Sequence, residues 1–110
     1  MAGAPYQYDL SLSADGTFEH SIDDLRMEDG SPFPFAEYAI EYAVSRDGCQ
    51  VMLRTQAAGV AVDADQGAVT FSGPMPAPGS YAHAMRLRHL ATGKIAPLFG
   101  GALIIEEGLF

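Results

Sequence analysis

The sequence predicts an all-β protein, a single antiparallel β-sandwich of about seven strands. Apolar and polar residues alternate with a period of two in several segments, as expected for strands with one buried face. Turn residues recur between these segments, and no window of helical length shows a 3.6-residue period. We expect residues 1–110 to form one domain with its own core and short flexible ends at 1–5 and 108–110.

Two strands are predicted in the N-terminal segment. Tyr6, Tyr8, Leu10 and Leu12 alternate with polar residues, which indicates a strand. A turn at 14–16 precedes a second alternating segment, and the Asp-Gly pair in this turn favours a hairpin between the two.

The clearest strand signal lies at 36–46. The apolar residues Tyr38, Ile40, Tyr42 and Val44 fall on one face, whereas the other face carries acidic residues, Ala and Ser. Shorter strands are expected at 51–54, 60–63 and 68–72, separated by further turns.

The C-terminal part begins with a proline-rich connector at 73–79. Proline has no N–H to donate to a strand ladder, so we expect an extended crossover there. A strand at 80–90 follows, and a turn at 91–94 leads into a last strand at 95–107. This strand should break at Pro97 or at Gly100-Gly101.

The alternating segments also predict the hydrophobic core. Its expected members are the apolar residues on the inward beat of each strand: Tyr8, Leu10, Phe18, Ile22, Tyr38, Ile40, Tyr42, Val69, Phe71, Tyr81, Met85, Leu87 and Ile104.

Charge and composition exclude several classes of partner. The formal net charge is -8, and nucleic-acid binding needs clustered Lys and Arg, so no nucleic-acid partner is expected. Residues 1–55 hold ten acidic and three basic residues (net -7), and 56–110 hold four and three (net -1). The longest apolar run, Ile95–Ile105, is far shorter than the roughly 20 residues of a membrane helix, so no membrane partner is expected. Cys49 is the single cysteine, which makes an intrachain disulfide impossible.

Several turn and strand motifs occur in an order that resembles a known family. They are an Asp-Gly-x-Pro turn, an aromatic strand ending in a basic residue, a Gly-x-Tyr strand, a Thr-Gly hairpin and a closing strand between two glycines: Asp29-Gly30-Ser31-Pro32, Tyr38–Arg46, Pro78-Gly79-Ser80-Tyr81, Thr92-Gly93 and Gly101–Gly108. This order resembles small tailed-phage virion proteins with an immunoglobulin-like β-sandwich, related to the N-terminal domain of phage baseplate upper proteins. The Trp often found before the first turn in such proteins is missing, and His20 and Ile22 stand there.

The resemblance implies a non-enzymatic virion structural protein, made in the host cytoplasm. It would be an oligomeric tail, baseplate or head–tail component whose partners are other virion proteins and copies of itself. One alternative is a capsid decoration protein. An alternative of another class is a small carbohydrate- or peptide-binding module, which would need an exposed aromatic platform.

No residues form a recognisable catalytic, cofactor or metal site, and we predict none. Asp63 and Asp65 have the i, i+2 spacing of calcium ligands, but a plain β-turn is favoured because further oxygen ligands are missing nearby. Of the three histidines, His83 and His89 lie on one predicted strand about 20 Å apart, too far to share a metal ion. These two histidines and His20 are all predicted to be core or interface residues.

Two features suggest contacts between subunits. Arg86, Arg88 and Lys94 form the one basic patch, which could meet the acidic N-terminal half of a neighbouring copy in a head-to-tail interface. A scatter of solvated bases explains the same residues equally well. Leu109 and Phe110 are large apolar residues at the end of the sequence, which either pack into the protein's own core or insert into a partner.

Overall fold

The computed structural model describes residues 6–27 and 29–109. This part of the chain contains nine strands and one short 3₁₀ helix, η1 (Phe35–Glu37). In chain order the strands are β1 (Tyr6–Gln7), β2 (Leu10–Ser13), β3 (Phe18–Ile22), β4 (Tyr38–Arg46), β5 (Cys49–Thr55), β6 (Val60–Asp63), β7 (Ala68–Gly73), β8 (Gly79–His89) and β9 (Ile95–Glu106). None of the described segments is a helix long and apolar enough to span a membrane.

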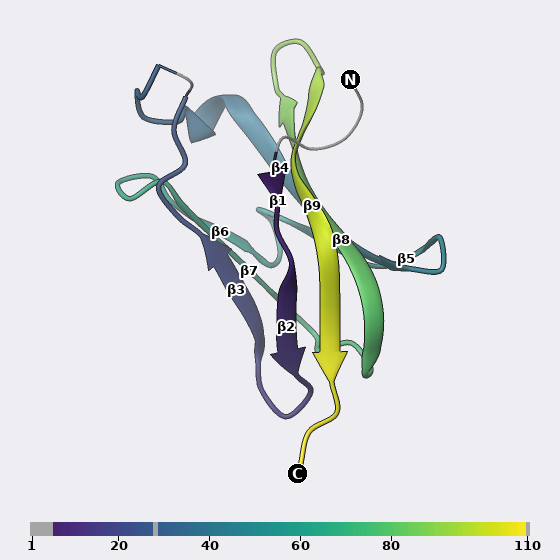
Figure 1. The fold of residues 1–110 in the computed structure, drawn as a ribbon. Coiled ribbons are helices and arrows are strands. Elements are labelled where there is room, and N and C mark those ends of the chain that lie inside the picture. Colours follow the sequence, from purple (N-terminus) through teal and green to yellow (C-terminus); the bar gives the residue numbers. More distant parts are fainter. Residues whose placement is uncertain (1–5, 28, 110) are drawn as a thin grey trace.

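The strands form two sheets that face each other (Figure 1). The larger sheet has the order β1-β9-β8-β4-β5, with β2 also paired to β9, and the smaller has the order β3-β7-β6. Both β1 and β2 run parallel to β9, whereas the other pairs are antiparallel. The predicted all-β sandwich is therefore confirmed.

The predicted hairpin of the first two strands is wrong. β2 pairs with β9 in the larger sheet, and β3 pairs with β7 in the smaller one, so the turn at 14–16 carries the chain from one sheet to the other. The predicted first strand is also divided, because the chain leaves the ladder at Tyr8 and Asp9 between β1 and β2. This division is one reason why the described residues form nine strands and not the predicted seven or so.

The start of the fourth strand and the middle of the last strand also differ from expectation. Residues 36 and 37 belong to η1, and the strand begins at Tyr38. β9 does not break at Pro97 or at the two glycines. Met85 pairs with Phe99 and Arg86 with Pro97, so Leu98 is the extra residue of a β-bulge.

The core lies between the two sheets and contains most of the predicted residues. Tyr42, Ile40 and Met85 are fully buried, and Tyr8, Leu10, Ile22 and Tyr38 pack against the core while staying partly exposed. Ile104 is the exception. The bulge at Leu98 shifts the alternation of β9, so that Leu103 and Ile105 point inward instead. The connector at 73–79 joins β7 to β8 and crosses between the sheets as predicted.

Candidate functional site

Four aromatic side chains form a polar network inside the core. Tyr8 follows β1, His20 lies in β3 of the opposite sheet, and Tyr42 and His83 lie in β4 and β8. The Tyr8 hydroxyl is 3.2 Å from His20 Nδ1, and His20 Nε2 is 3.0 Å from the Tyr42 hydroxyl. That hydroxyl is 2.8 Å from His83 Nδ1, and His83 Nε2 is 2.7 Å from the backbone oxygen of Tyr8. The network therefore begins and ends at Tyr8 and links the two sheets.

With both histidines neutral, the backbone oxygen of Tyr8 fixes the direction of every hydrogen bond in this network. A carbonyl can only accept, so His83 donates from Nε2, and its neutral ring then accepts at Nδ1 from the Tyr42 hydroxyl. The Tyr42 oxygen accepts from His20 Nε2–H, and His20 Nδ1 accepts from the Tyr8 hydroxyl. All four bonds are satisfied when both histidines are neutral.

Burial favours this uncharged state. Desolvation, together with a smaller effect of the nearby His83, lowers the pKa of His20 to about 4. Desolvation likewise lowers the pKa of His83, partly offset by its bond to the Tyr8 carbonyl. It also raises the pKa values of Tyr8 and Tyr42. His20 and His83 are only 8% and 2% exposed, so this network serves as a structural link between the sheets.

The prediction of core histidines is thus confirmed for His20 and His83. His89 lies apart at the end of β8, half-buried, with Nδ1 3.2 Å from the Thr92 hydroxyl.

At the Asp63–Asp65 turn, Asp63 Oδ1 accepts the backbone N–H of Asp65 at 3.2 Å, the geometry of a plain Asx turn. Within the described ranges, no three His, Cys, Asp or Glu side chains gather as metal ligands.

Motif residues that are distant in the sequence meet at the end of β4. The guanidinium carbon of Arg46 lies 5.4 Å from the centre of the Tyr81 ring, within the range of a cation–π contact. Gly79 allows this approach, since a Cβ there would lie 3.0 Å from the Arg46 guanidinium. The Tyr81 hydroxyl donates to the backbone oxygen of Ala77 at 2.6 Å. The basic strand end and the Gly-x-Tyr motif therefore have a packing role.

The two glycines of the closing strand also allow close approach. A Cβ at Gly101 would overlap the backbone oxygen of Tyr8, where the chain leaves the ladder between β1 and β2. Asp9 fills this gap, because its carboxylate accepts the backbone N–H of Ala102 at 2.9 Å, and this bond lowers the pKa of Asp9. A Cβ at Gly108 would overlap the Asp15 carboxylate.

The predicted basic patch is smaller than expected. Arg86 lies directly opposite Glu41 on the neighbouring strand, and its Nε is 2.5 Å from a carboxylate oxygen of Glu41. Arg88 and Lys94 are exposed and form no ion pair with any described residue. They lie near each other because Arg88 pairs with Ile95, the residue after Lys94.

The end of the sequence contributes one exposed apolar residue. Leu109 is 95% exposed, so it does not pack into the core of its own chain. Its backbone N–H donates to the Asp15 carboxylate at 2.6 Å. Phe110 and the predicted flexible end at 1–5 lie outside the described residues.

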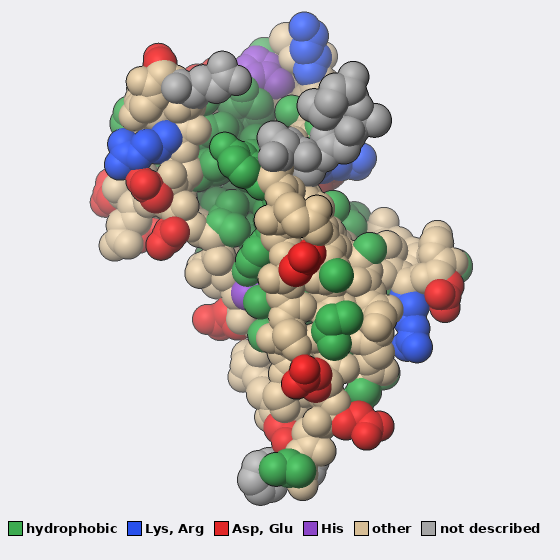
Figure 2. Space-filling view, viewed as in Figure 1, with side chains coloured by type: hydrophobic (Ala, Val, Ile, Leu, Met, Phe, Trp, Pro, Cys, Tyr) green, Lys and Arg blue, Asp and Glu red, His purple; other side chains and the backbone are tan. Residues whose placement is uncertain are grey.

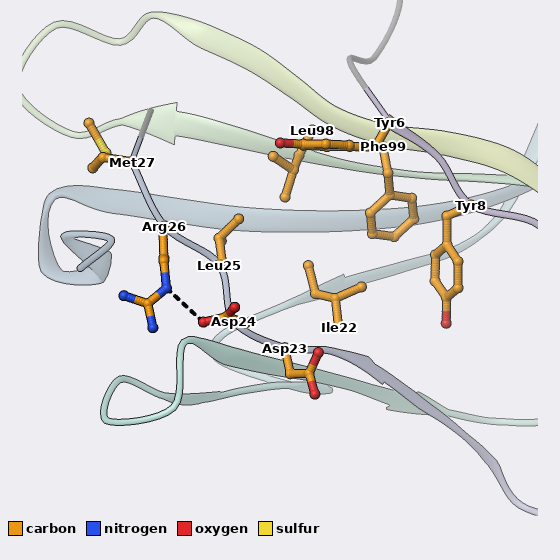
Figure 3. Close-up of a pocket in the computed structure, with 10 residues that line it drawn as sticks. All are labelled: Tyr6, Tyr8, Ile22, Asp23, Asp24, Leu25, Arg26, Met27, Leu98 and Phe99. Carbon is orange, nitrogen blue, oxygen red and sulfur yellow. Dashed lines mark hydrogen bonds and ion pairs between the residues drawn. The ribbon is translucent and has the colours of Figure 1, made fainter. Parts of the chain in front are cut away.

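A cleft opens between the sheets at the edge formed by β1 and the segment after β3 (Figure 3). Its volume is about 540 Å³, and apolar side chains form most of its walls. Figure 2 shows apolar atoms in a hollow beside charged side chains on this face. The lining residues are Tyr6, Tyr8, Ile22, Asp23, Asp24, Leu25, Arg26, Met27, Leu98 and Phe99.

Sequence reasoning missed this cleft. Tyr6 was expected to follow the alternation of the first strand, but it lies on an edge strand and is 62% exposed. The one usable signal was the acidic pair Asp23-Asp24 next to Leu25, which interrupts the alternation of its segment.

Another, smaller depression lies on the outer face of the larger sheet. Its volume is about 350 Å³, and it lies over β4, β5, β8 and β9. Leu53 and Ile95 line it and are 49% and 51% exposed.

The chain matches no protein-family model and no curated protein sequence. Among solved structures it is similar to InlP of Listeria monocytogenes, with a TM-score of 0.54 and 16% identity over 90% of this chain and 26% of that one. It is also similar to a chicken TCR, with a TM-score of 0.56 and 14% identity over 93% of this chain and 54% of that one. The protein is an immunoglobulin-like β-sandwich. At this identity the likeness concerns the fold alone, and the resemblance to phage proteins stays a prediction.

Proposed function

We propose that this immunoglobulin-like sandwich is a non-enzymatic structural subunit, which assembles with copies of itself through the outer face of its larger sheet. The observation that carries this proposal is the composition of that face. The solvent-facing side of an antiparallel sheet is usually polar. Here the outward positions of the two central strands include four alanines, Ala39, Ala43, Ala82 and Ala84.

Larger apolar residues flank these alanines. Leu53 on β5 is paired with Ala43, and Ile95 on β9 is paired with Arg88, so the apolar surface extends across four strands. The charges of Glu41 and Arg86 on this face neutralise each other. Short side chains leave the sheet flat enough for a second sheet to pack on it at the usual spacing of about 10 Å.

The order of motifs supports a more specific proposal. It resembles small tailed-phage virion proteins, so we propose that the assembly is a tail, baseplate or head–tail component. Capsid decoration is the alternative within the same class. A carbohydrate- or peptide-binding module is the alternative of another class, and the exposed ring of Tyr6 beside the cleft favours it.

Light scattering coupled to size-exclusion chromatography tests the assembly. The unmodified protein should elute as an oligomer, and Leu53→Asp should shift it to the monomer. Val51→Asp is the matched control, because Val51 lies on the same strand with 52% exposure but lines a different depression. A monomeric unmodified protein, or equal behaviour of the two variants, would contradict the proposal. Mass spectrometry of purified virions tests the phage assignment separately.

A further inference from the structure

We propose that the cleft between the sheets binds an extended basic peptide segment of a partner protein, with a lysine or arginine side chain seated in it. This cleft opens beside β1, whereas the proposed assembly face lies over β4, β5, β8 and β9. The two proposals therefore stand independently.

The wall formed by the segment after β3 is held in place by backbone hydrogen bonds. The N–H groups of Asp24 and Leu25 donate to the backbone oxygens of Gln66 and Gly67, at 3.2 and 3.0 Å. Gly67 packs so tightly against Leu25 that a Cβ there would lie 2.8 Å from the Leu25 backbone. This wall is thus anchored to the β6–β7 turn, and the cleft has a defined shape before any ligand arrives.

The opposite wall comes from the larger sheet. Figure 3 shows Leu98, Phe99 and Tyr6 above the cleft, with Leu25 and Ile22 below. The Phe99 ring is held edge-on against Tyr8, with 5.0 Å between the ring centres. These walls offer apolar surface for an aliphatic chain and aromatic rings for a cation, two features that suit a lysine or arginine side chain.

The charge at the cleft has the opposite sign to such a ligand. Asp24 is already paired with Arg26, with 2.7 Å between Oδ1 and Nε. Asp23 is exposed and makes no ion pair or side-chain hydrogen bond within residues 6–27 and 29–109, which leaves its carboxylate free for a cationic head. The net charge of -8 also steers a basic segment towards the protein.

Two strand edges make an extended peptide the best match. β1 pairs with β9 alone, and β3 pairs with β7 alone, so each borders the open side of the sandwich with an edge that no other described strand covers. An extended peptide can bond to such an edge through its backbone while alternate side chains enter a neighbouring pocket. A small cation would use only the pocket.

Fluorescence anisotropy with a labelled short peptide of alternating lysine and serine tests the proposal. We expect Asp23→Asn to weaken binding at least about fivefold, which corresponds to about 1 kcal/mol. Asp47→Asn is the matched control, because it removes the same charge from the β4–β5 turn, outside the cleft, and should change affinity less than about twofold. Tyr6→Ala should also weaken binding, since it removes an aromatic ring of the cleft.

Three outcomes would overturn the proposal. The first is an equal loss of affinity for Asp23→Asn and Asp47→Asn. The second is equal binding of a peptide with glutamate in place of lysine. The third is full displacement of the peptide by free lysine at a concentration equal to that of the peptide's residues. NMR amide shifts give an independent readout, because bound peptide should perturb Tyr6, Leu25 and Leu98 before residues of the outer sheet face. Shifts confined to that outer face would contradict the assignment.

Discussion

His83 Nε2 lies 2.7 Å from the backbone oxygen of Tyr8, and this contact makes Nε2 the hydrogen-bond donor of the His83 ring. Because the carbonyl accepts, His83 donates from Nε2, and all four bonds form with both histidines neutral. A second proton on either ring would place a positive charge in a buried site, and desolvation disfavours that charge. Folding and histidine protonation are therefore opposed.

The first prediction is a loss of stability in mild acid. The unfolded chain should bind protons at these histidines near their ordinary pKa of about 6.5, whereas the folded pKa of His20 is about 4. Stability from the network is complete above pH 6.5 and falls as the pH approaches 4. The slope should be about 1.4 kcal/mol per pH unit for each histidine. Urea unfolding at a series of pH values measures it.

The variant His20→Gln tests the origin of this slope. It removes one titrating group, so the unfolding free energy should depend less steeply on pH, even though the variant is less stable at pH 7. A slope identical to that of the unmodified protein would show that other groups cause the acid sensitivity.

The second prediction concerns the hydroxyl of Tyr42. Tyr42→Phe keeps the ring but leaves His20 Nε2 without an acceptor and His83 Nδ1 without a donor in a fully buried place. We expect a loss of about 2–4 kcal/mol in the free energy of unfolding. Tyr81→Phe is the control, because it removes one bond to a loop carbonyl and should cost about 1 kcal/mol. Equal losses in the two variants would argue against the network.

The third prediction tests the gap between β1 and β2. Gly101→Ala should lower the free energy of unfolding by about 1–3 kcal/mol, because its methyl group would push the Tyr8 backbone away from β9. Gly16→Ala adds the same group in a turn where its Cβ would lie 3.5 Å from the nearest oxygen, and it should be tolerated. Thermal unfolding of both variants provides the comparison, and an unchanged melting temperature for Gly101→Ala would refute the explanation.

The fourth prediction concerns Leu109 and Phe110. Removing both should weaken incorporation into a particle or partner complex while leaving the melting temperature almost unchanged, because Leu109 lies in solvent. Leu109→Ser distinguishes the contribution of the side chain from that of the backbone, since it keeps the N–H that bonds to Asp15. If incorporation is unaltered in both variants, Leu109 and Phe110 do not contribute to assembly.

The strands with strict alternation were predictable from the sequence, whereas their partners were not. In β4, the beat of Ile40, Tyr42 and Val44 specifies one buried face, and the structure agrees. The turn at 14–16 carries equally clear local chemistry, yet it joins strands of different sheets. Turn residues constrain the local path of the chain and leave the choice of partner strand to long-range packing.

The last strand and the candidate sites show a different limit of prediction from the sequence. Residues 102–105 are all apolar, so no alternation distinguishes Ile104 from its neighbours, and the bulge at Leu98 decides which side faces inward. His20 and His83 were expected in the core, but their link through Tyr42 joins residues from three strands far apart in the sequence. The cleft likewise exists only because β1 and β3 lie at the same side of the sandwich (Figure 1).

The parallel pairing of β1 and β2 with β9 affects how the protein would respond to mechanical load. The described chain starts at one end of this pairing and leaves it at the other (Figure 1). Tension between the two ends would therefore act along the strands and load the hydrogen bonds of this pairing together, in shear. A subunit with this geometry resists stretching better than one whose terminal strands could be peeled apart one bond at a time.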